Sequence, residues 1–168
     1  YLKPSTRQSA TEYGLSRTPI PPSDWAAFRE ALVNAFCHRD YTMLGNVRVL
    51  IDDEGMVISN PGGFIDGVNL KNLLTVEPHG RNPALADAMK RIGLAEKTGR
   101  GIDRIYEGSI MFGRPWPDYS ESTSRMVKLF IQRAKADIPF AKFVADEQNR
   151  QGKSLSIYTL MMLSLLKS

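Results

Sequence analysis

The chain has 168 residues, of which 42% are hydrophobic and 24% are charged, and this composition is typical of one ordinary globular domain with a small appendage. The net charge of +4 is compatible with a nucleotide or nucleic-acid partner, although the basic residues are spread along the chain. The single cysteine, Cys37, excludes an intrachain disulfide. The lack of an apolar run of about 18 residues argues against a membrane partner and for a cytoplasmic location.

The first predicted helix covers residues 24–38 and follows a segment rich in Ser, Thr and Pro. Its large apolar side chains fall on one side, which we expect to face the core. These side chains are Trp25, Phe28, Leu32 and Phe36. Glu30 and Asn34 lie one turn apart on nearly the opposite side. They could hold an activated water and a magnesium ion beside a phosphate, or they could be two solvated polar residues.

A β-hairpin is predicted next, with strands at 46–51 and 56–59 and a glycine-containing turn between them. The second strand leads into Asn60-Pro61-Gly62-Gly63. Two glycines after a strand allow positive φ angles and a close approach of the backbone to a ligand, although a plain turn uses the same residues. The loop that follows, residues 64–80, has a length that is typical of functional or mobile loops.

A second helix is predicted over residues 82–93, with Asn82 as its N-cap, Pro83 in its first position and Gly93 as its stop. Gly99-Arg100-Gly101 then opens a third helix that we expect to end near residue 112. The unpaired backbone N–H groups and the positive dipole at such a helix start suit a phosphate group, but many ordinary helix starts share the pattern.

The C-terminal part is predicted to contain a strand at 125–132, a helix at 139–151 and an apolar helix at 156–168. The last helix is apolar nearly all round, so something must cover it, and we expect a fragment of a longer protein. In the helix before it, we expect Phe140, Phe143 and Val144 to face inward.

Gln151-Gly152-Lys153-Ser154 has a superficial likeness to the end of a phosphate-binding P-loop. Glu147 stands where that motif needs its first glycine, and no apolar strand precedes it. We therefore interpret Gly152 as a helix stop with Lys153 in solvent, and these residues give no support to a helicase motor.

In this order, the motifs resemble the Bergerat, or GHKL, ATP-binding fold. The resemblance lies in FREALVNAFCHRDY, ISNPGGF, RNPALADAMKRIGL and EKTGRGIDRI, and it covers about residues 18–165. More closely, these segments look like the family found C-terminally in proteins labelled RecG-like ATP-dependent DNA helicases or transcriptional regulators. In that family a Schlafen/AlbA-type domain usually precedes the segment and a winged helix often follows it.

The resemblance implies an α+β fold, a two-layer α/β sandwich with helices on one face of a mixed, mostly antiparallel sheet and a C-terminal helical extension. It implies three parts: a connector from an upstream domain at 1–17, a GHKL-like nucleotide-binding domain at 18–134, and a helical linker with the start of a winged-helix module at 135–168. DNA would then be bound through flanking domains, and the domain itself could form a homodimer.

The resemblance also implies roles for single residues. Glu30 matches the general base that activates water, and Asn34 matches the Mg²⁺ ligand. Asn60 stands where the family has the Asp that accepts a hydrogen bond from the adenine amino group, and it can accept only without charge. Gly62 and Gly63 would pass under the base. The residues implied along the phosphates are Lys97, Thr98, Gly99, Arg100 and Gly101, with His38 or Arg39 beside them.

Three functions follow from this resemblance. The first is an ATP-binding regulatory module of a DNA-binding transcriptional regulator or RecG-like protein. The second is an active Mg²⁺-dependent ATPase in which Glu30 is the general base. The third is a scaffold or dimerisation domain that keeps the fold without a ligand. ATP and Mg²⁺ are the cofactors implied by the first two functions.

Overall fold

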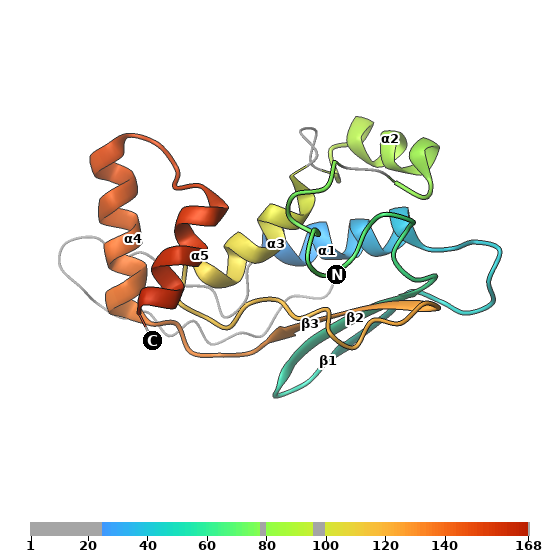
Figure 1. Cartoon of the computed structure of the whole chain (residues 1–168), viewed down its shortest axis with the longest axis horizontal. Coiled ribbons are helices and arrows are strands. Elements are labelled where there is room, and N and C mark those ends of the chain that lie inside the picture. The colour runs from blue at the N-terminus through green and yellow to red at the C-terminus, as the bar shows by residue number, and fades with distance from the viewer. Residues whose placement is uncertain (1–24, 78–79, 96–99, 168) are drawn as a thin grey trace.

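The computed structural model describes residues 25–77, 80–95 and 100–167. The predicted connector at 1–17 therefore lies outside the described residues. The elements are α1 (Trp25–His38), β1 (Arg48–Ile51), β2 (Gly55–Pro61), α2 (Pro83–Arg91), α3 (Gly101–Ile110), β3 (Met126–Gln132), α4 (Ile138–Gln151) and α5 (Ile157–Leu166) (Figure 1). Their order is the one that the sequence predicts.

The described sheet has three strands in the order β1-β2-β3, and both ladders are antiparallel. The predicted hairpin is confirmed, with Arg48 opposite Ser59 in the β1–β2 pair. Its turn is held by the Asp52 carboxylate, which accepts hydrogen bonds from the backbone N–H groups of Glu54 and Gly55 at 2.9 and 3.0 Å. β3 pairs with the other side of β2, so the central strand β2 lies next to a strand that is about 70 residues further along the chain.

Helices α1 and α3 cover one face of this sheet, which gives the predicted two layers of an α+β fold (Figure 1). The core between the layers combines residues from both helices, from β2 and β3, and from the segment before β3. Its buried members are Ala31, Ala35, Ile58, Ile105, Tyr119 and Leu129.

The side of α1 that we expected to face the core reaches it only at Phe28, which packs against the buried residues. Trp25 is 64% exposed and Phe36 is 36% exposed. The buried stripe of the helix instead carries small side chains, Ala27, Ala31 and Ala35. Since α3 packs directly against α1, small residues are needed where the two helices approach each other. We assigned the buried side of α1 from its large aromatic residues, whereas the packing selects its alanines.

Asn82 occupies the N-cap position of α2 that the sequence predicts, but its side chain does not cap the helix. It makes no side-chain capping hydrogen bond there. Its amide nitrogen donates to the backbone carbonyl oxygens of Cys37 and Arg39 at 2.9 and 2.8 Å, so it closes the C-terminal end of α1 instead. The end of α2 is as predicted, because Gly93 follows it with φ = +75° and donates to the Lys90 carbonyl oxygen.

Helices α4 and α5 pack on the C-terminal end of α3 and form a second core (Figure 1). Its buried residues are Ile110, Phe140, Val144, Leu155, Ile157 and Leu160. The predicted inward positions of Phe140 and Val144 are confirmed, but Phe143 is 51% exposed. Gly152 ends α4 with φ = +65°, and Lys153 is exposed, as the helix-stop interpretation predicts.

Within the described ranges, no helix is both long enough and apolar enough to cross a membrane.

Candidate functional site

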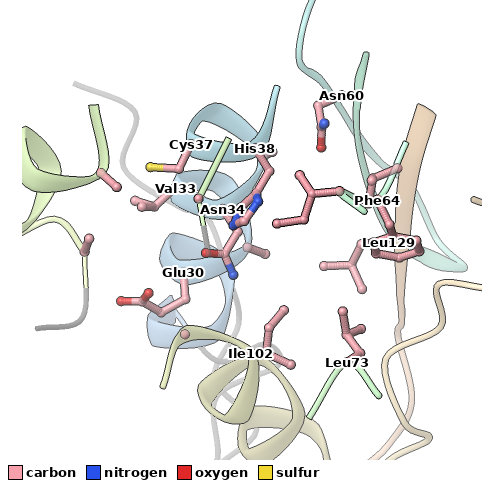
Figure 2. A pocket seen from close by; sticks show the side chains of 18 of the residues that line it. Glu30, Val33, Asn34, Cys37, His38, Asn60, Phe64, Leu73, Ile102 and Leu129 are labelled. Atoms are coloured by element: carbon pink, nitrogen blue, oxygen red, sulfur yellow. The ribbon is translucent and has the colours of Figure 1, made fainter. Parts of the chain in front are cut away.

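A cavity of about 430 Å³ lies where α1, β2, the start of α3 and the segment 63–77 meet. Glu30, Asn34 and His38 line it from α1. Phe64, Leu73 and Leu129 form an apolar wall opposite α1, and Ile102 adds an apolar side chain from the start of α3, as Figure 2 shows. Three sequence segments that are distant from one another thus share one hollow, and this combination of an apolar wall with a few polar groups is typical of small-molecule sites.

The two predicted polar residues of α1 lie against the start of α3. A Cβ atom placed on Gly101 would lie 3.2 Å from Glu30 Oε2 and 3.3 Å from both Nδ2 and Oδ1 of Asn34. The Glu30 side chain is only 3% exposed, and it lies close to the positive end of the α3 dipole. This end of a helix favours a negative charge, so the position suits a buried carboxylate.

Asn60 reaches the cavity from the end of β2. It is 3% exposed, and its amide nitrogen donates to the Pro61 carbonyl oxygen at 3.2 Å. Within the described residues, its side-chain carbonyl oxygen accepts no hydrogen bond. Asn60 therefore offers the cavity an uncharged acceptor, which is the group needed to receive a hydrogen bond from an amino group of a ligand.

The glycines after β2 are required by the protein's own packing. Gly62 has φ = +92°, and a Cβ atom there would lie 2.7 Å from the Asp40 Cβ atom. A Cβ atom on Gly63 would lie 2.6 Å from the Ser124 carbonyl oxygen. Gly63 lines the cavity and Gly62 does not. We expected the backbone of both glycines to approach a ligand. At Gly62 the backbone instead lies close to Asp40, which follows the end of α1.

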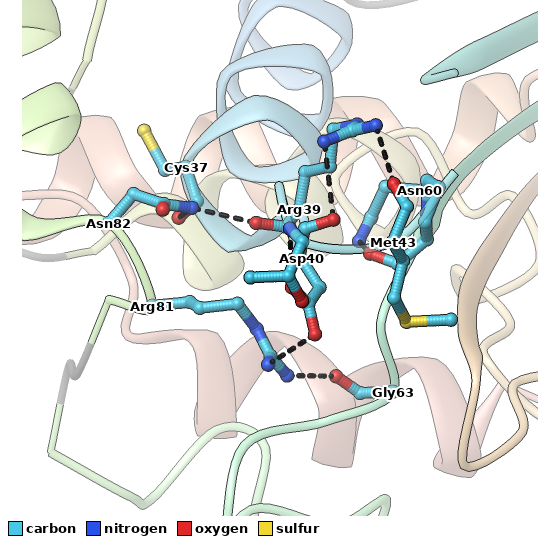
Figure 3. A network of polar contacts seen from close by, with 10 residues as sticks. Cys37, Arg39, Asp40, Met43, Asn60, Gly63, Arg81 and Asn82 are labelled. Carbon is cyan, nitrogen blue, oxygen red and sulfur yellow. Dashed lines mark hydrogen bonds and ion pairs between the residues drawn. The ribbon is translucent and has the colours of Figure 1, made fainter. Parts of the chain in front are cut away.

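A polar network fixes this corner of the cavity (Figure 3). The Arg81 guanidinium contacts the Asp40 carboxylate at 3.4 Å and donates to the Gly63 carbonyl oxygen at 3.0 Å. Hydrogen bonds from the side chain and backbone of Thr42, together with the positive charge of Arg81, lower the pKa of the Asp40 carboxyl. With the two hydrogen bonds of Asn82, the network ties the end of α1 to the glycine turn and to the start of α2.

Arg39 and His38 have different positions. The Arg39 guanidinium donates to the carbonyl oxygens of Asp40, Met43 and Gly45 at 3.2, 3.1 and 2.6 Å, so it holds the turn after α1 and does not line the cavity. His38 does line it. Burial, together with the positive charge of Arg81, lowers the pKa of the His38 imidazole, so the ring is neutral at pH values near 7.

Of the predicted phosphate loop, Arg100 and Gly101 line the cavity, whereas Lys97, Thr98 and Gly99 lie outside the described residues. Arg100 directly precedes α3. Its positive charge acts on the carboxyl of Asp103, where it opposes the rise in pKa caused by burial.

Two further features were not predicted from the sequence. Lys90 of α2 and Cys37 of α1 also line the cavity. Burial and the negative charge of Glu30 raise the pKa of the Cys37 thiol, while the charge of Lys90 acts in the opposite direction. Lys90 lies one helical turn after Ala86, and both are half-buried in the structure, but no motif in the sequence of α2 marks this face as part of a site.

Comparison with known proteins identifies solved structures of similar fold and a matching family. One of these structures is the crystal structure of the DIP2311 protein from Corynebacterium diphtheriae, with a TM-score of 0.73 and 29% sequence identity. The match covers 83% of this chain and 28% of that chain, so the present sequence spans little more than a quarter of the neighbour's length. Among curated proteins, no sequence matches this chain.

A family model matches residues 45–130, which begin just before β1 and end within β3. The matched segment contains Asn60, Lys90, Arg100 and Gly101, and thus most of the cavity outside α1. The chain therefore belongs to the ATPase-like family described as "Putative ATP-dependent DNA helicase recG C-terminal".

Proposed function

We propose that this chain is a nucleotide-binding domain that takes ATP with Mg²⁺ and acts as a regulatory module of a longer DNA-binding protein. The observation that supports this function best is the convergence of Glu30, Asn34, Asn60 and Gly101 on one cavity. Each comes from a segment whose sequence resembles a nucleotide-contacting motif of GHKL proteins. Family membership supports an ATPase-like domain, and the nucleotide and the regulatory role are our proposal.

The cavity has features that suit the two ends of a nucleotide. Its volume of about 430 Å³ is within the range of small-molecule sites. Asn60 and the apolar side chains of Phe64 and Ile102 suit a planar base with an exocyclic amino group. The start of α3, with Arg100 before it, suits phosphate groups because helix N-termini attract anions.

The side chains present fit a magnesium ion that arrives with the phosphates. Asn34 supplies an amide oxygen next to the Glu30 carboxylate, and Mg²⁺ in nucleotide sites uses one or two protein ligands together with phosphate oxygens. Throughout the described parts of the chain, no group of three or more His, Cys, Asp or Glu side chains forms a metal site of its own. When bound, the ion would neutralise phosphate charge, and Asn34 would orient it.

The proposed domain division has some support from the two cores. One core joins α1, α3 and the sheet, and the other joins α4 and α5 to the end of α3. This is in keeping with a nucleotide-binding domain at 18–134 and a helical linker at 135–168 that begins a winged-helix module. DNA binding and dimerisation remain proposals for the longer protein.

Thermal unfolding with ATP and Mg²⁺ tests the binding function. A ligand present at about 100 times its Kd adds about 2.7 kcal/mol of stability, so the wild-type protein should melt at a clearly higher temperature. Asn34→Ala should lose most of this shift, and the control Asn149→Ala, an exposed residue of α4, should keep it. No shift at millimolar ATP with folded protein would support the empty scaffold instead.

A second function, ATP hydrolysis, is favoured by the position of Glu30. Its carboxylate is buried beside Asn34 and the start of α3, where it could accept a proton from a water aligned on the terminal phosphate. Glu30→Gln keeps the size of the side chain, so ATP binding should remain while phosphate release falls by about 100-fold or more. Phosphate release that is unchanged in Glu30→Gln would remove the hydrolysis proposal and leave the binding proposal intact.

A further inference from the structure

We propose that Lys90 of α2 contacts the phosphate chain of the bound nucleotide and makes the cavity select nucleoside triphosphate over nucleoside. This inference rests on the proposed nucleotide-binding function and adds a residue to it. Three observations support it: α2 presents Lys90 to the cavity, no described residue supplies a counter-charge to its ammonium group, and its charge acts on Cys37 of α1.

The orientation of α2 brings Lys90 to the cavity. Ala86 and Lys90 are one helical turn apart, and both line the cavity. Both are half-buried, whereas their neighbours Asp87 and Arg91 are exposed. The helix therefore presents one face, and Lys90 with it, to the hollow and the other face to solvent.

The Lys90 ammonium group has no anionic partner within the described residues. Arg81 is paired with Asp40, Arg150 with Glu147 and Lys167 with Asp137. No carboxylate of the described residues lies within ion-pair distance of Lys90, and no hydrogen bond holds its amine. A partly desolvated cation at a cavity wall gains much more from an arriving anion than a fully hydrated one.

The charge of Lys90 acts on the part of α1 that carries Asn34. It lowers the pKa of the Cys37 thiol, against burial and the charge of Glu30, which raise it. Cys37 is three residues after Asn34, so the two lie on neighbouring positions of the same helix face. An anion held by Asn34 through a magnesium ion would thus lie close to Lys90.

The chemistry of Lys90 suits a phosphate chain. Lysine offers a compact positive charge with three donors, which suits phosphate oxygens. Arg100 lines the cavity at the start of α3, so two cations from different elements face it. A triphosphate can contact both of them, whereas adenosine has no charge to offer either.

Calorimetric titration with adenosine, ADP-Mg²⁺ and ATP-Mg²⁺ tests this role. In Lys90→Met the Kd for ATP-Mg²⁺ should rise by about tenfold or more, the effect of one hydrogen bond to a charged group. The Kd for adenosine should change less than about twofold, since adenosine carries no charge to be attracted. Arg91→Met removes the same charge from the exposed side of α2 and should bind all three ligands as the wild type does. Lys90→Arg should restore part of the ATP affinity.

The outcomes separate this inference from the function beneath it. If the wild-type protein binds none of the three ligands, the nucleotide function itself fails and Lys90 has no role in it. If the wild type binds ATP and Lys90→Met binds it equally well, the function stands and the Lys90 assignment is overturned. An equal loss of adenosine and ATP affinity in folded Lys90→Met would also overturn it, because Lys90 would then only support the shape of the cavity.

Discussion

Gly101 is the residue at which the start of α3 meets the two polar side chains of α1. A Cβ atom at this position would lie 3.2 Å from Glu30 Oε2 and 3.3 Å from the amide atoms of Asn34. Its φ angle is not in the left-handed region, so alanine is compatible with the backbone. The cost of a side chain here therefore falls on Glu30 and Asn34.

We expect Gly101→Ala to keep the free energy of unfolding within about 1 kcal/mol, because alanine is the better helix former. The Kd for ATP-Mg²⁺ should rise by about tenfold or more, because the displaced Glu30 and Asn34 no longer hold the ligand geometry. Urea unfolding and calorimetric titration measure the two effects separately. An unchanged Kd would show that the tight contact has no part in binding.

The buried His38 can be tested through the pH dependence of the free energy of unfolding. Burial and the charge of Arg81 lower the pKa of its imidazole below the ordinary value of 6.5. Above pH 6.5 both the folded and the unfolded chains hold a neutral ring, so the lowered pKa costs no stability there. Below pH 6.5 the His38 imidazole takes up a proton in the unfolded chain but stays neutral in the folded protein. The free energy of unfolding therefore falls with decreasing pH until the pKa of His38 in the folded protein is reached.

His38→Gln should therefore lose less stability than the wild type when the pH is lowered from about 7 to about 5. Urea unfolding at both pH values gives the comparison. The carboxyl of Asp40 also has a lowered pKa, but it titrates below this interval because its ordinary value is 3.8. An identical decrease in the two proteins would mean that the His38 pKa is not lowered in the fold.

At the element scale, local signals in the sequence predicted where helices and strands begin and end. Gly93 and Gly152 end α2 and α4 at positive φ, and the turn at 52–55 makes the β1–β2 hairpin. These features depend on a few adjacent residues, so one sequence is enough to find them. The same holds for the order of the motifs, which predicted the family.

The side of a helix that faces the core could not be predicted in the same way, because it depends on packing partners that are distant in the sequence. The buried stripe of α1 is made of alanines since α3 lies directly against it, and no pattern within 25–38 reveals that neighbour. The role of the Asn82 side chain was missed for the same reason. Its partners, Cys37 and Arg39, are more than 40 residues away. Lys90 was missed because the predicted phosphate contacts were taken from the segment 97–101 and from His38 and Arg39, and not from α2.

The role of Asn82 can be tested with a substitution that separates the two interpretations. Aspartate is as good an N-cap as asparagine, so Asn82→Asp would be tolerated if the side chain of Asn82 only capped α2. The structure has Asn82 donating two hydrogen bonds to carbonyl oxygens of α1, and a carboxylate cannot donate them. We therefore expect Asn82→Asp to lower the free energy of unfolding by about 1–3 kcal/mol in urea unfolding.

The matched control is Asn149→Asp, at an exposed position of α4, which should change the free energy of unfolding by less than about 0.5 kcal/mol. If both aspartate variants are equally stable, the hydrogen bonds from Asn82 to the end of α1 contribute nothing.

At the scale of the whole molecule, two connections join the cavity to the C-terminal helices. Helix α3 starts at the cavity with Gly101 and ends in the second core with Ile110 (Figure 1). The Tyr158 hydroxyl of α5 donates to the carbonyl oxygen of Leu74 at 3.1 Å, and Leu74 lines the cavity. A ligand that orders the segment 64–77 would thereby also restrain α5, as a regulatory module requires.

This coupling predicts the behaviour of Tyr158→Phe. In the wild type, ATP-Mg²⁺ should slow amide hydrogen exchange in α5 as well as around the cavity. In Tyr158→Phe the slowing around the cavity should persist, while the slowing in α5 should decrease, because the link to Leu74 is lost. Equal protection of α5 in the two proteins would show that the Tyr158 hydroxyl does not couple the cavity to α5. The control is Tyr41→Phe, which removes a hydroxyl that donates to the Phe36 carbonyl oxygen at the end of α1.

The proposed function requires that one cavity, formed by α1, the end of β2 and the start of α3, holds a nucleotide. A crystal structure of the protein grown with ATP and Mg²⁺ tests it most directly. We expect the base beside Asn60 and the phosphates between Asn34, Lys90 and Gly101. A nucleotide bound elsewhere on the protein, or a cavity that stays empty at millimolar ATP, would contradict it.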